Sequence, residues 1–376
     1  EAAAEYEMVN EKHYKFNPEQ SAHYSRLLED MKKSGAFPAS IIHYLSKKAY
    51  TEAALDLTHS FYSILYLSKA LIRQKTKENI NILYVHDKGQ YTNPVYAAIG
   101  GFFKTLNAEQ PNIKCKTVEI SSRQTIEKAP LLLNELSSGH HQAVKYDGDQ
   151  KRWVTAYKDA SLQTGQKAAK FAKNGVYLII GGLSGIGWII SAFLYANHGA
   201  SVIIAGRSKM TADMEEKLDS IRYDGASISY IQADMSDKQQ VIKLAEKIHA
   251  DYSEINGVIY SAGVLKDSLI MNKTDAEAQA VLQSKVNGVI HLDEALRDMP
   301  LDFFVLFSSI SSEIGSLGQA DYAYANRFLE HFAEWRECMR KAGGRSGKTI
   351  AVNWPFWKDG GMSVDPGIQD IMKMEY

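Results

Sequence analysis

Short runs of aliphatic and β-branched residues alternate with amphipathic stretches along the whole chain. In the first half, apolar runs cover residues 41–45, 80–85 and 114–120. Such alternation of buried strands with helices is the pattern of a doubly wound parallel sheet. The intervening stretches predict helices over residues 51–74, 93–107 and 124–136, followed by a hairpin over 142–157 that turns at Asp147-Gly148-Asp149.

The same pattern repeats in the second half, which opens with a buried strand at residues 175–180. A polar segment, residues 158–174, lies between the two halves and reads as a linker. We therefore expect an α/β protein with two Rossmann-like sheets, a first unit of residues 1–165 and a second of residues 166–376. Further strands of the second unit are predicted over residues 201–205, 227–232, 257–260, 303–307 and 349–352.

The second half contains a Gly-rich turn suited to binding a cofactor, and the first half does not. After the strand at 175–180 the chain reads Gly181-Gly182-Leu183-Ser184-Gly185-Ile186-Gly187, and a helix then opens at Trp188. Glycines between a strand and a helix let the backbone approach a pyrophosphate, whose charge lies at the helix N-terminus. The first half has His86-Asp87-Lys88-Gly89 at the equivalent place, so we expect a truncated scaffold without cofactor there. A purely structural turn is the alternative for the glycines taken alone.

The residues after the second strand of this unit favour NADPH over NADH. Arg207 and Ser208 lie where an enzyme for the unphosphorylated cofactor would carry a carboxylate. A carboxylate repels a 2′-phosphate, whereas Arg and Ser can bind one through charge-assisted hydrogen bonds. The competing interpretation is a solvated basic turn.

Two further segments fit a bound dinucleotide. Asp234, next to Met235, can accept a hydrogen bond from the adenine amine, although a helix N-cap at Asp234 or Ser236 is an equally compatible role. Small residues after the fourth strand would let the cofactor lie against the sheet, and these are Ser261, Ala262 and Gly263.

A candidate catalytic set follows downstream in the order Lys285, Ser309, Tyr322 and Asn326. Reduction of a carbonyl needs a hydride source, a proton donor and a group that holds the oxygen. Tyr322 can donate the proton and Ser309 can hold the oxygen, while Asn326 can order water that returns the proton. Because a tyrosine has a pKa near 10, we expect the Lys285 ammonium to lower it. Each residue taken alone also has a purely structural explanation. Lys285 could be a solvated helix residue, Ser309 a strand-end cap, and Asn326 a helix residue that bonds locally.

Composition excludes several classes of function. The chain of 376 residues has 43 basic and 44 acidic side chains, which gives no sign of nucleic-acid or membrane binding. Two cysteines, Cys115 and Cys338, show neither metal spacing nor a disulfide framework, and no metal site is expected. We expect a cytoplasmic protein. The chain opens without an initiator Met, which suggests a piece excised from something larger.

The order of the catalytic set resembles the ketoreductase domains of modular polyketide synthases. Ordinary short-chain dehydrogenases carry Tyr-x-x-x-Lys, whereas here Asn326 follows Tyr322 and the Lys lies upstream. The first half resembles the family's structural subdomain through the sequence motif Asn93-Pro94-Val95-Tyr96-Ala97-Ala98. The sequences of residues 262–267, 318–322 and 353–357 are most similar to those of assembly lines with a separately encoded acyltransferase. Such assembly lines often mix peptide and polyketide modules.

The resemblance implies reduction of a ketoacyl chain tethered through phosphopantetheine to an acyl carrier protein. It also implies neighbouring synthase domains, a monomeric excised domain, and the roles named above for Lys285, Ser309, Tyr322 and Asn326. The chain departs from the family at Ile180, where Thr is usual, and at Tyr260, where His is usual. The family continues through a lid helix to a last strand, so with residues 364–376 we expect a partial lid.

The resemblance further predicts a B-type ketoreductase that forms the D-alcohol. Such domains usually have Leu-Asp-Asp where this chain has Leu265-Lys266-Asp267, and Asp267 is kept. Domains that form the L-alcohol usually have Trp at the position of Ile314. The segment from Trp354 to Met362 would close over the substrate.

Two rival functions remain open from the sequence. A free-standing dehydrogenase for a small ketone would explain the catalytic set, but its relatives usually tetramerise instead of carrying a cofactor-free first half. A redox-silent or epimerising domain is the other rival. The identity of the acyl chain and the α- or β-position of the ketone stay undetermined.

Overall fold

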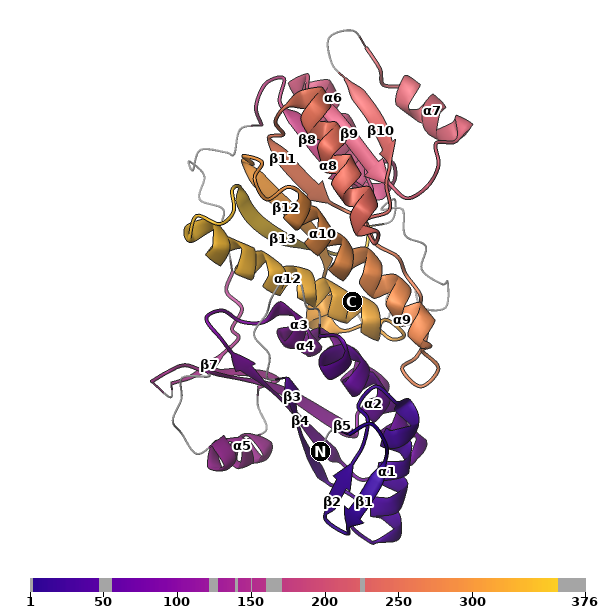
Figure 1. The fold of residues 1–376 in the computed structure, drawn as a ribbon, viewed down its shortest axis with the longest axis vertical. Helices are drawn as coiled ribbons and strands as arrows, with labels where there is room; N and C mark the ends of the chain where they lie inside the picture. Colours follow the sequence, from indigo (N-terminus) through magenta and orange to yellow (C-terminus); the bar gives the residue numbers. More distant parts are fainter. Residues whose placement is uncertain are drawn as a thin grey trace.

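Two large sheets follow one another along the long axis of the molecule (Figure 1). The computed structural model describes residues 3–46, 56–121, 128–138, 141–149, 151–159, 171–223 and 227–357. Within these ranges no helix is both long and apolar enough to cross a membrane. The domain boundary predicted between residues 165 and 166, the lid after residue 357 and Met362 all lie outside the described residues.

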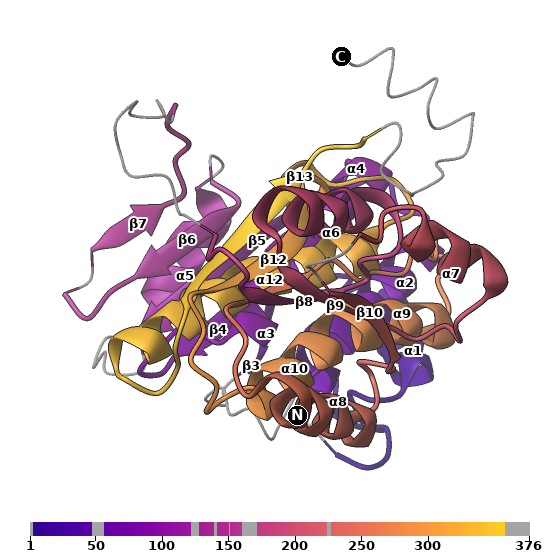
Figure 2. The ribbon, with the colours of Figure 1, turned by 90° about the horizontal axis from the view of Figure 1, so that it is seen from above.

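The first sheet has five strands in the order β3-β4-β5-β6-β7. The first four are parallel and β7 is antiparallel to β6, which forms the predicted hairpin. Figure 2 shows this hairpin on the side of the molecule away from β10. The strands are β3 (Ser40–Ser46), β4 (Ile80–Lys88), β5 (Ile113–Ser121), β6 (Ala143–Tyr146) and β7 (Arg152–Val154).

Alternation of side chains along β4 gives this sheet two buried faces. Ile82 and Tyr84 face a core formed with helices α2 (Ser63–Arg73) and α4 (Ile99–Glu109). Leu83 and Val85 face the opposite side, where Leu132 of α5 (Lys128–Ser137) covers them. A short helix, α3 (Pro94–Ala97), precedes α4 and is capped by the Asn93 side chain.

Three details of this half differ from the expectation. The helix predicted over 51–74 begins in the described residues as a π-helical turn, Thr58–Tyr62, and continues as α2; residues 51–55 lie outside the description. The π-turn arises from a shift in hydrogen-bond register that the apolar spacing does not reveal. An N-terminal hairpin, β1 (Glu7–Asn10) and β2 (His13–Lys15), and helix α1 (Ser21–Lys33) were not expected, because they bury few side chains.

The second sheet has six parallel strands in the order β10-β9-β8-β11-β12-β13. The order reverses at β8, and in open α/β sheets ligands bind at such a switch point, outside the carboxyl ends of the strands. All six predicted strands are present, with β12 and β13 longer than expected. They are β8 (Val176–Ile180), β9 (Ser201–Gly206), β10 (Ile228–Gln232), β11 (Gly257–Tyr260), β12 (Phe303–Ser309) and β13 (Lys348–Trp354).

Helices cover both faces of this sheet. On one face, α6 (Gly185–His198) packs Leu194 and Tyr195 against alternate residues of β8 and β9. The other face belongs to the large core that also holds side chains of the first half. The remaining helices are α7 (Ala212–Asp219), α8 (Lys238–Tyr252), α9 (Asp275–Leu282), α10 (Gly288–Ala295), α11 (Ser311–Ile314) and α12 (Ala320–Lys341).

Helix α12 joins the two halves, and in Figure 1 it lies where they meet. The Tyr324 hydroxyl donates a hydrogen bond of 2.7 Å to the Val95 carbonyl, and the Tyr324 ring packs edge-on against Phe61. A Cβ at Gly101 of α4 would lie 2.4 Å from the Ala323 carbonyl oxygen, so only glycine permits this approach of the two helices. Both halves therefore share one core.

Candidate active site

The predicted Gly-rich turn lies at the carboxyl end of β8 and depends on glycine at two points. Gly181 has a φ of +81°, and a Cβ there would lie 3.1 Å from the Ala262 nitrogen. A Cβ at Gly187 would lie 2.6 Å from both the Gly181 carbonyl oxygen and the Ser261 Oγ. The turn is thus pressed against the segment after β11, which leaves its outer surface open as a cradle.

This cradle forms one wall of a cavity of about 260 Å³. The cavity brings together most of the residues expected to bind cofactor, whereas Gly185, Ile186 and Gly187 belong to the first turn of α6 and do not line it. Arg207 and Ser208 are exposed at its edge. The residues fit a nicotinamide dinucleotide, and those lining the cavity include Gly181, Gly182, Leu183, Ser184, Arg207, Ser208, Asp234, Met235, Ser261, Ala262 and Gly263.

Two residues that the sequence analysis did not single out tie this turn down. The Ser191 hydroxyl, in α6, lies within hydrogen-bond distance of the carbonyls of Gly182 (3.1 Å) and Gly187 (2.9 Å) and can donate to either. Lys217 donates to the Leu183 carbonyl at 2.8 Å and lies over the Trp188 ring. Lys217 is 34 residues from Leu183, so no local motif signals its contact. Ser191 lies close in sequence, but its contact with Gly182 depends on how α6 folds back on the turn.

The Asp234 side chain does not cap a helix. It accepts hydrogen bonds from the Ser236 backbone N–H (2.9 Å) and hydroxyl (2.7 Å), and so closes a turn at the edge of the cavity. The N-cap of α8 is Asp237, whose side chain accepts from the backbone N–H groups of Gln239 and Gln240. The alternative that placed the cap at Asp234 or Ser236 is therefore wrong.

The four candidate catalytic residues come together beside the cavity. Tyr322 is in the first turn of α12 and only 6 % exposed, and its hydroxyl is hydrogen-bonded with the side chains of Ser309 and Asn326. Ser309 ends β12, while Asn326 lies one helical turn beyond Tyr322 and donates to its carbonyl at 2.8 Å. The Lys285 Nζ lies 5.4 Å from the centre of the Tyr322 ring.

The Tyr322 hydroxyl is a weak acid in this setting. Burial raises its pKa, while the hydrogen bonds with Asn326 and Ser309 lower it and so partly offset the burial. The net shift of the Tyr322 pKa is upward, opposite to the lowering expected from the Lys285 ammonium, because burial is the largest cause. Because its pKa is raised, the phenol keeps the proton that it has to donate.

Lys285 is buried, and burial lowers the pKa of its amine from 10.5 to about 7. Its Nζ donates to the Phe307 carbonyl at 2.9 Å, at the end of the neighbouring strand β12. A Cβ at Gly263 would lie 2.9 Å from the Lys285 Cε, so the glycine makes room for the lysine. The amine can therefore gain or lose a proton near neutral pH.

A π-helical turn, Gln283–Asn287, carries Lys285 between α9 and α10. Such turns are frequent at functional sites. The Tyr260 hydroxyl donates to the Ser284 carbonyl at 2.5 Å, and a Cβ at Gly288 would lie 2.1 Å from that hydroxyl. The departure of Tyr260 from the family pattern thus supports the turn beside Lys285.

The candidate stereocontrol residues lie on different elements. Asp267, in the segment after β11, accepts a hydrogen bond of 3.1 Å from the Gln319 side chain. Ile314 ends α11 and is 52 % exposed. Trp354 is the last residue of β13 and packs against Phe307, so it belongs to the sheet edge instead of a mobile cover.

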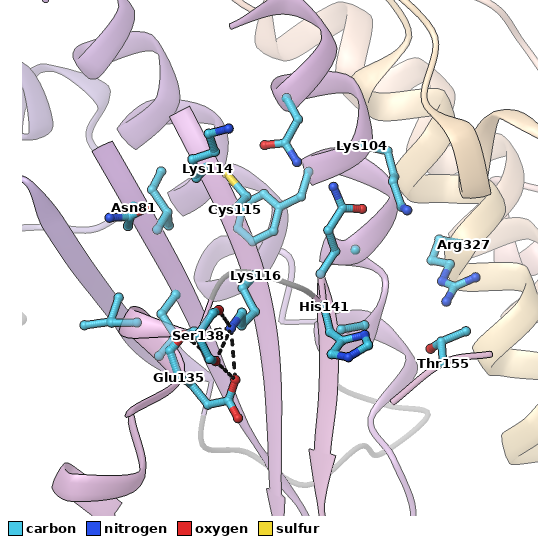
Figure 3. Close-up of a pocket in the computed structure, with 18 of the residues that line it drawn as sticks. Asn81, Lys104, Lys114, Cys115, Lys116, Glu135, Ser138, His141, Thr155 and Arg327 are labelled. Atoms are coloured by element: carbon cyan, nitrogen blue, oxygen red, sulfur yellow. Dashed lines mark hydrogen bonds and ion pairs between the residues drawn. The ribbon is translucent and has the colours of Figure 1, made fainter. Parts of the chain in front are cut away.

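A second, larger cavity of about 840 Å³ lies in the first half and reaches α12 (Figure 3). Its walls come from the amino ends of β4, β5 and β6, the end of the strands opposite to a doubly wound fold's ligand site. Figure 3 shows Lys104, His141 and Arg327 on one side and Lys116 with Glu135 on the other.

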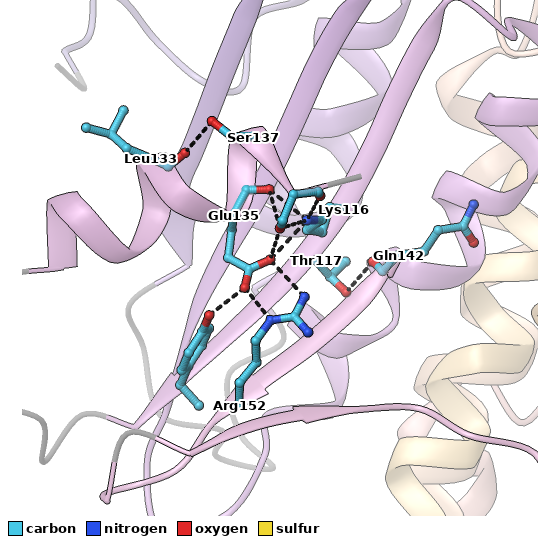
Figure 4. A network of polar contacts seen from close by, with 9 residues as sticks. Lys116, Thr117, Leu133, Glu135, Ser137, Gln142 and Arg152 are labelled. Atoms are coloured by element: carbon cyan, nitrogen blue, oxygen red, sulfur yellow. Dashed lines mark hydrogen bonds and ion pairs between the residues drawn. The ribbon is translucent and has the colours of Figure 1, made fainter. Parts of the chain in front are cut away.

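Most charges around this cavity are neutralised by each other. The Glu135 carboxylate accepts from Lys116 (3.0 Å) and Arg152 (2.6 Å), as Figure 4 shows. These hydrogen bonds, with one from Tyr146, lower the pKa of Glu135 to about 2 although burial opposes them. The network braces α5 against the sheet and holds Glu135 and Lys116 in mutual contacts.

Comparison with known families matches each half separately. Residues 175–359 match the family described as KR domain, and residues 1–138 match the family described as beta-ketoacyl synthase-like, N-terminal. The first match begins just before β8 and contains the cavity and the whole catalytic set.

Similar proteins are found among polyketide synthases. The chain is 35% identical to polyketide synthase PksN of Bacillus subtilis over 86% of its own length, and 38% identical to PksL of the same organism over 74%. It spans only 6% of each of these proteins.

Solved structures agree in fold along the chain. An N-terminal ketoreductase from the macrolactin assembly line has a TM-score of 0.86 and 30% identity, over 96% of this chain and 73% of that one. A ketoreductase domain from the bacillaene assembly line has a TM-score of 0.77 and 33% identity, over 83% and 74%. The chain therefore belongs to the ketoreductase domains of modular polyketide synthases.

Proposed function

We propose that this chain reduces a β-ketoacyl thioester, carried by the phosphopantetheine of an acyl carrier protein, to the hydroxyacyl thioester with NADPH. The observation that carries the proposal is the convergence of Lys285, Ser309, Tyr322 and Asn326 beside a glycine cradle. Membership of the ketoreductase family supports it.

The residues can be given roles in one reduction step. The Ser309 hydroxyl would hold the ketone oxygen, and the Tyr322 hydroxyl would donate its proton to that oxygen as the carbonyl carbon receives a hydride. The hydride brings the electron pair of the new C–H bond, while the carbonyl π pair moves to the oxygen and forms the O–H bond with the proton from Tyr322. NADPH bound in the cavity supplies the hydride when present.

After the reduction, the Tyr322 hydroxyl would regain its proton by way of Lys285 and Asn326. The Asn326 Oδ1 is buried and has no hydrogen-bond partner among the described residues, so it can order a water molecule. Because the Lys285 pKa is near 7, its amine can release a proton and take up another at neutral pH. This pair forms the inner end of the proposed proton path.

The cofactor preference and stereochemistry belong to the same proposal. Arg207 and Ser208 at the edge of the cavity support NADPH, since no carboxylate stands there. The presence of Asp267, the last residue of the family's Leu-Asp-Asp motif, supports formation of the D-alcohol. Neighbouring synthase domains and the carrier protein are proposed partners.

The test follows NADPH absorbance with α- and β-ketoacyl pantetheine thioesters, with NADH in parallel, and resolves the alcohols by chiral chromatography. We expect turnover of the β-keto substrate with NADPH and formation of the D-alcohol. Tight NADPH binding without turnover of any thioester would contradict reduction and favour epimerisation, and no binding would favour a redox-silent scaffold.

A further inference from the structure

We propose that Glu109, Lys273 and Asp321 form a clamp that fixes two loops beside Tyr322, through which the cofactor-free half sets how the substrate is held. The loops are the β11–α9 loop, residues 261–274, which carries Asp267, and the α11–α12 loop, residues 315–319. The inference rests on the proposed function, because it concerns the substrate side of that same site.

Glu109 contributes from the first half. It is the last residue of α4, and its two carboxylate oxygens accept from two different loops. Oε2 accepts from the Ile270 backbone N–H at 2.8 Å, and Oε1 accepts from the Gly318 backbone N–H at 3.0 Å. One carboxylate therefore sets the separation of the loops, which are almost 50 residues apart in sequence.

Lys273 holds the same loops from inside. Its side chain is fully buried, and its three ammonium donors meet three acceptors. Nζ donates to the carbonyls of Lys266 and Gly318, the latter at 3.2 Å, and forms an ion pair of 3.0 Å with Asp321. Lys266 is adjacent to Asp267, so this cation fixes the backbone of the candidate stereocontrol residue.

Asp321 connects the clamp to the catalytic tyrosine. The oxygen that pairs with Lys273 also accepts from the Tyr322 backbone N–H at 2.9 Å. Since a buried carboxylate without its cation is costly, the pair holds the start of α12 in place. The position of Tyr322 relative to the β11–α9 loop then depends on Lys273.

Direct contacts between the loops complete the arrangement. The Ser268 N–H donates to the Gly318 carbonyl at 2.9 Å, and Gln319 donates to Asp267. The first half adds a second hold through α2, where Lys69 donates to the Lys273 carbonyl and Tyr66 donates to Asp275 at 2.8 Å. The first half thus contacts both loops directly, and Lys273 connects them to the residue before Tyr322.

The test uses Glu109→Gln in the full chain, with Glu29→Gln, an exposed carboxylate on α1 of the same half, as the matched control. A glutamine has one acceptor oxygen, so it can serve only one of the two N–H groups and turns an amide donor towards the other. We expect amide hydrogen exchange at Ile270 or Gly318 to accelerate roughly tenfold, the scale of one unpaired buried donor.

The kinetic readout separates positioning from general damage. In Glu109→Gln we expect the KM for the thioester to rise roughly tenfold and the D-to-L product ratio to fall. The NADPH Kd should stay close to that of the control, and the melting temperature should fall only by the modest amount that one unpaired buried donor costs. Lys273→Met should change the product ratio in the same direction; if it does not fold, the Glu109 variant decides alone.

Two results would overturn the clamp: loop exchange equal to that of the Glu29 control, or an unchanged product ratio and KM despite faster exchange. If the unaltered protein reduces no ketoacyl thioester, the proposed function falls, while the exchange comparison still decides whether Glu109 fixes the loops.

Discussion

Tyr322 and Tyr324 lie two positions apart on α12, and their side chains serve different surroundings. Tyr322 contacts Ser309, Asn326 and Lys285 beside the cavity, whereas Tyr324 donates to Val95 in the first half. Sequence reasoning identified Tyr322 from the order of Lys285, Ser309, Tyr322 and Asn326 after the Gly-rich turn. Nothing local marks Tyr324 as a contact between halves, because its partner is more than 200 residues away.

Phenylalanine substitutions should distinguish the proposed catalytic role of Tyr322 from the structural role of Tyr324. Tyr322→Phe removes the proton donor, and we expect kcat to fall roughly a hundredfold or more with unchanged NADPH affinity. Tyr324→Phe leaves a buried carbonyl unpaired, and we expect a loss of about 1–3 kcal/mol in stability with kcat retained. Steady-state kinetics and urea unfolding check both. Equal activity of Tyr322→Phe and the unaltered protein would refute the assigned role.

Lys285 should give the cofactor-free protein a pH-dependent stability. Its pKa is about 7 when folded and near 10.5 when unfolded, so between these values the unfolded state binds more protons. The cost of burying the charge is full below pH 7 and fades as the pH rises to 10.5. We expect Lys285→Met to lower the slope of unfolding free energy against pH in this window, measured by urea titration. The Lys243→Met variant, exposed on α8, should keep the slope.

Helix α12 depends on a buried ionic network as well as on apolar packing. Asp293 of α10 accepts from Arg336 (2.5 Å) and Arg345 (2.8 Å), and Arg336 also donates to Thr349 in β13 at 2.8 Å. One carboxylate thus connects two helices and a strand behind the active site. In the sequence these residues read as ordinary charged helix positions.

Removal of that carboxylate charge should destabilise the protein without changing its chemistry. We expect Asp293→Asn to cost about 3–5 kcal/mol, because two buried guanidinium groups lose their counter-ion. Asp298→Asn, an exposed carboxylate nearby in sequence, is the control and should cost little. Urea unfolding measures both, and a cost near that of the control would show that the network is not stabilising.

Element prediction succeeded where periodicity and burial agree. The strands of the second sheet follow from their apolar runs, and the turn after β8 follows from its glycines. The π-turn at Lys285 did not, since its register shift depends on Tyr260 and Gly288, which touch only in three dimensions. The candidate catalytic residues could be named from sequence, but their pKa directions could not, because burial decides them.

At the scale of the whole molecule, two adjacent glycines of α4 provide a test of how the halves fit. A Cβ at Gly100 meets no atom within 4 Å, whereas one at Gly101 would collide with the Ala323 backbone. We expect Gly100→Ala to stabilise by up to about 1 kcal/mol through helix propensity. Gly101→Ala should destabilise by more than that, with weaker substrate turnover. Thermal melts and kinetics check the pair, and equal melting temperatures would contradict close packing of α4 on α12.

The shared packing of α12 also bears on recombination between synthases. A chimera that imports only residues from β8 onward would set a foreign helix against Gly101 and a foreign loop pair against Glu109. Its failure would then say nothing about whether the imported catalytic residues suit the new acyl chain. Crossover points that move both sheets as one cassette keep these contacts matched, and they are the rational unit of exchange for this chain.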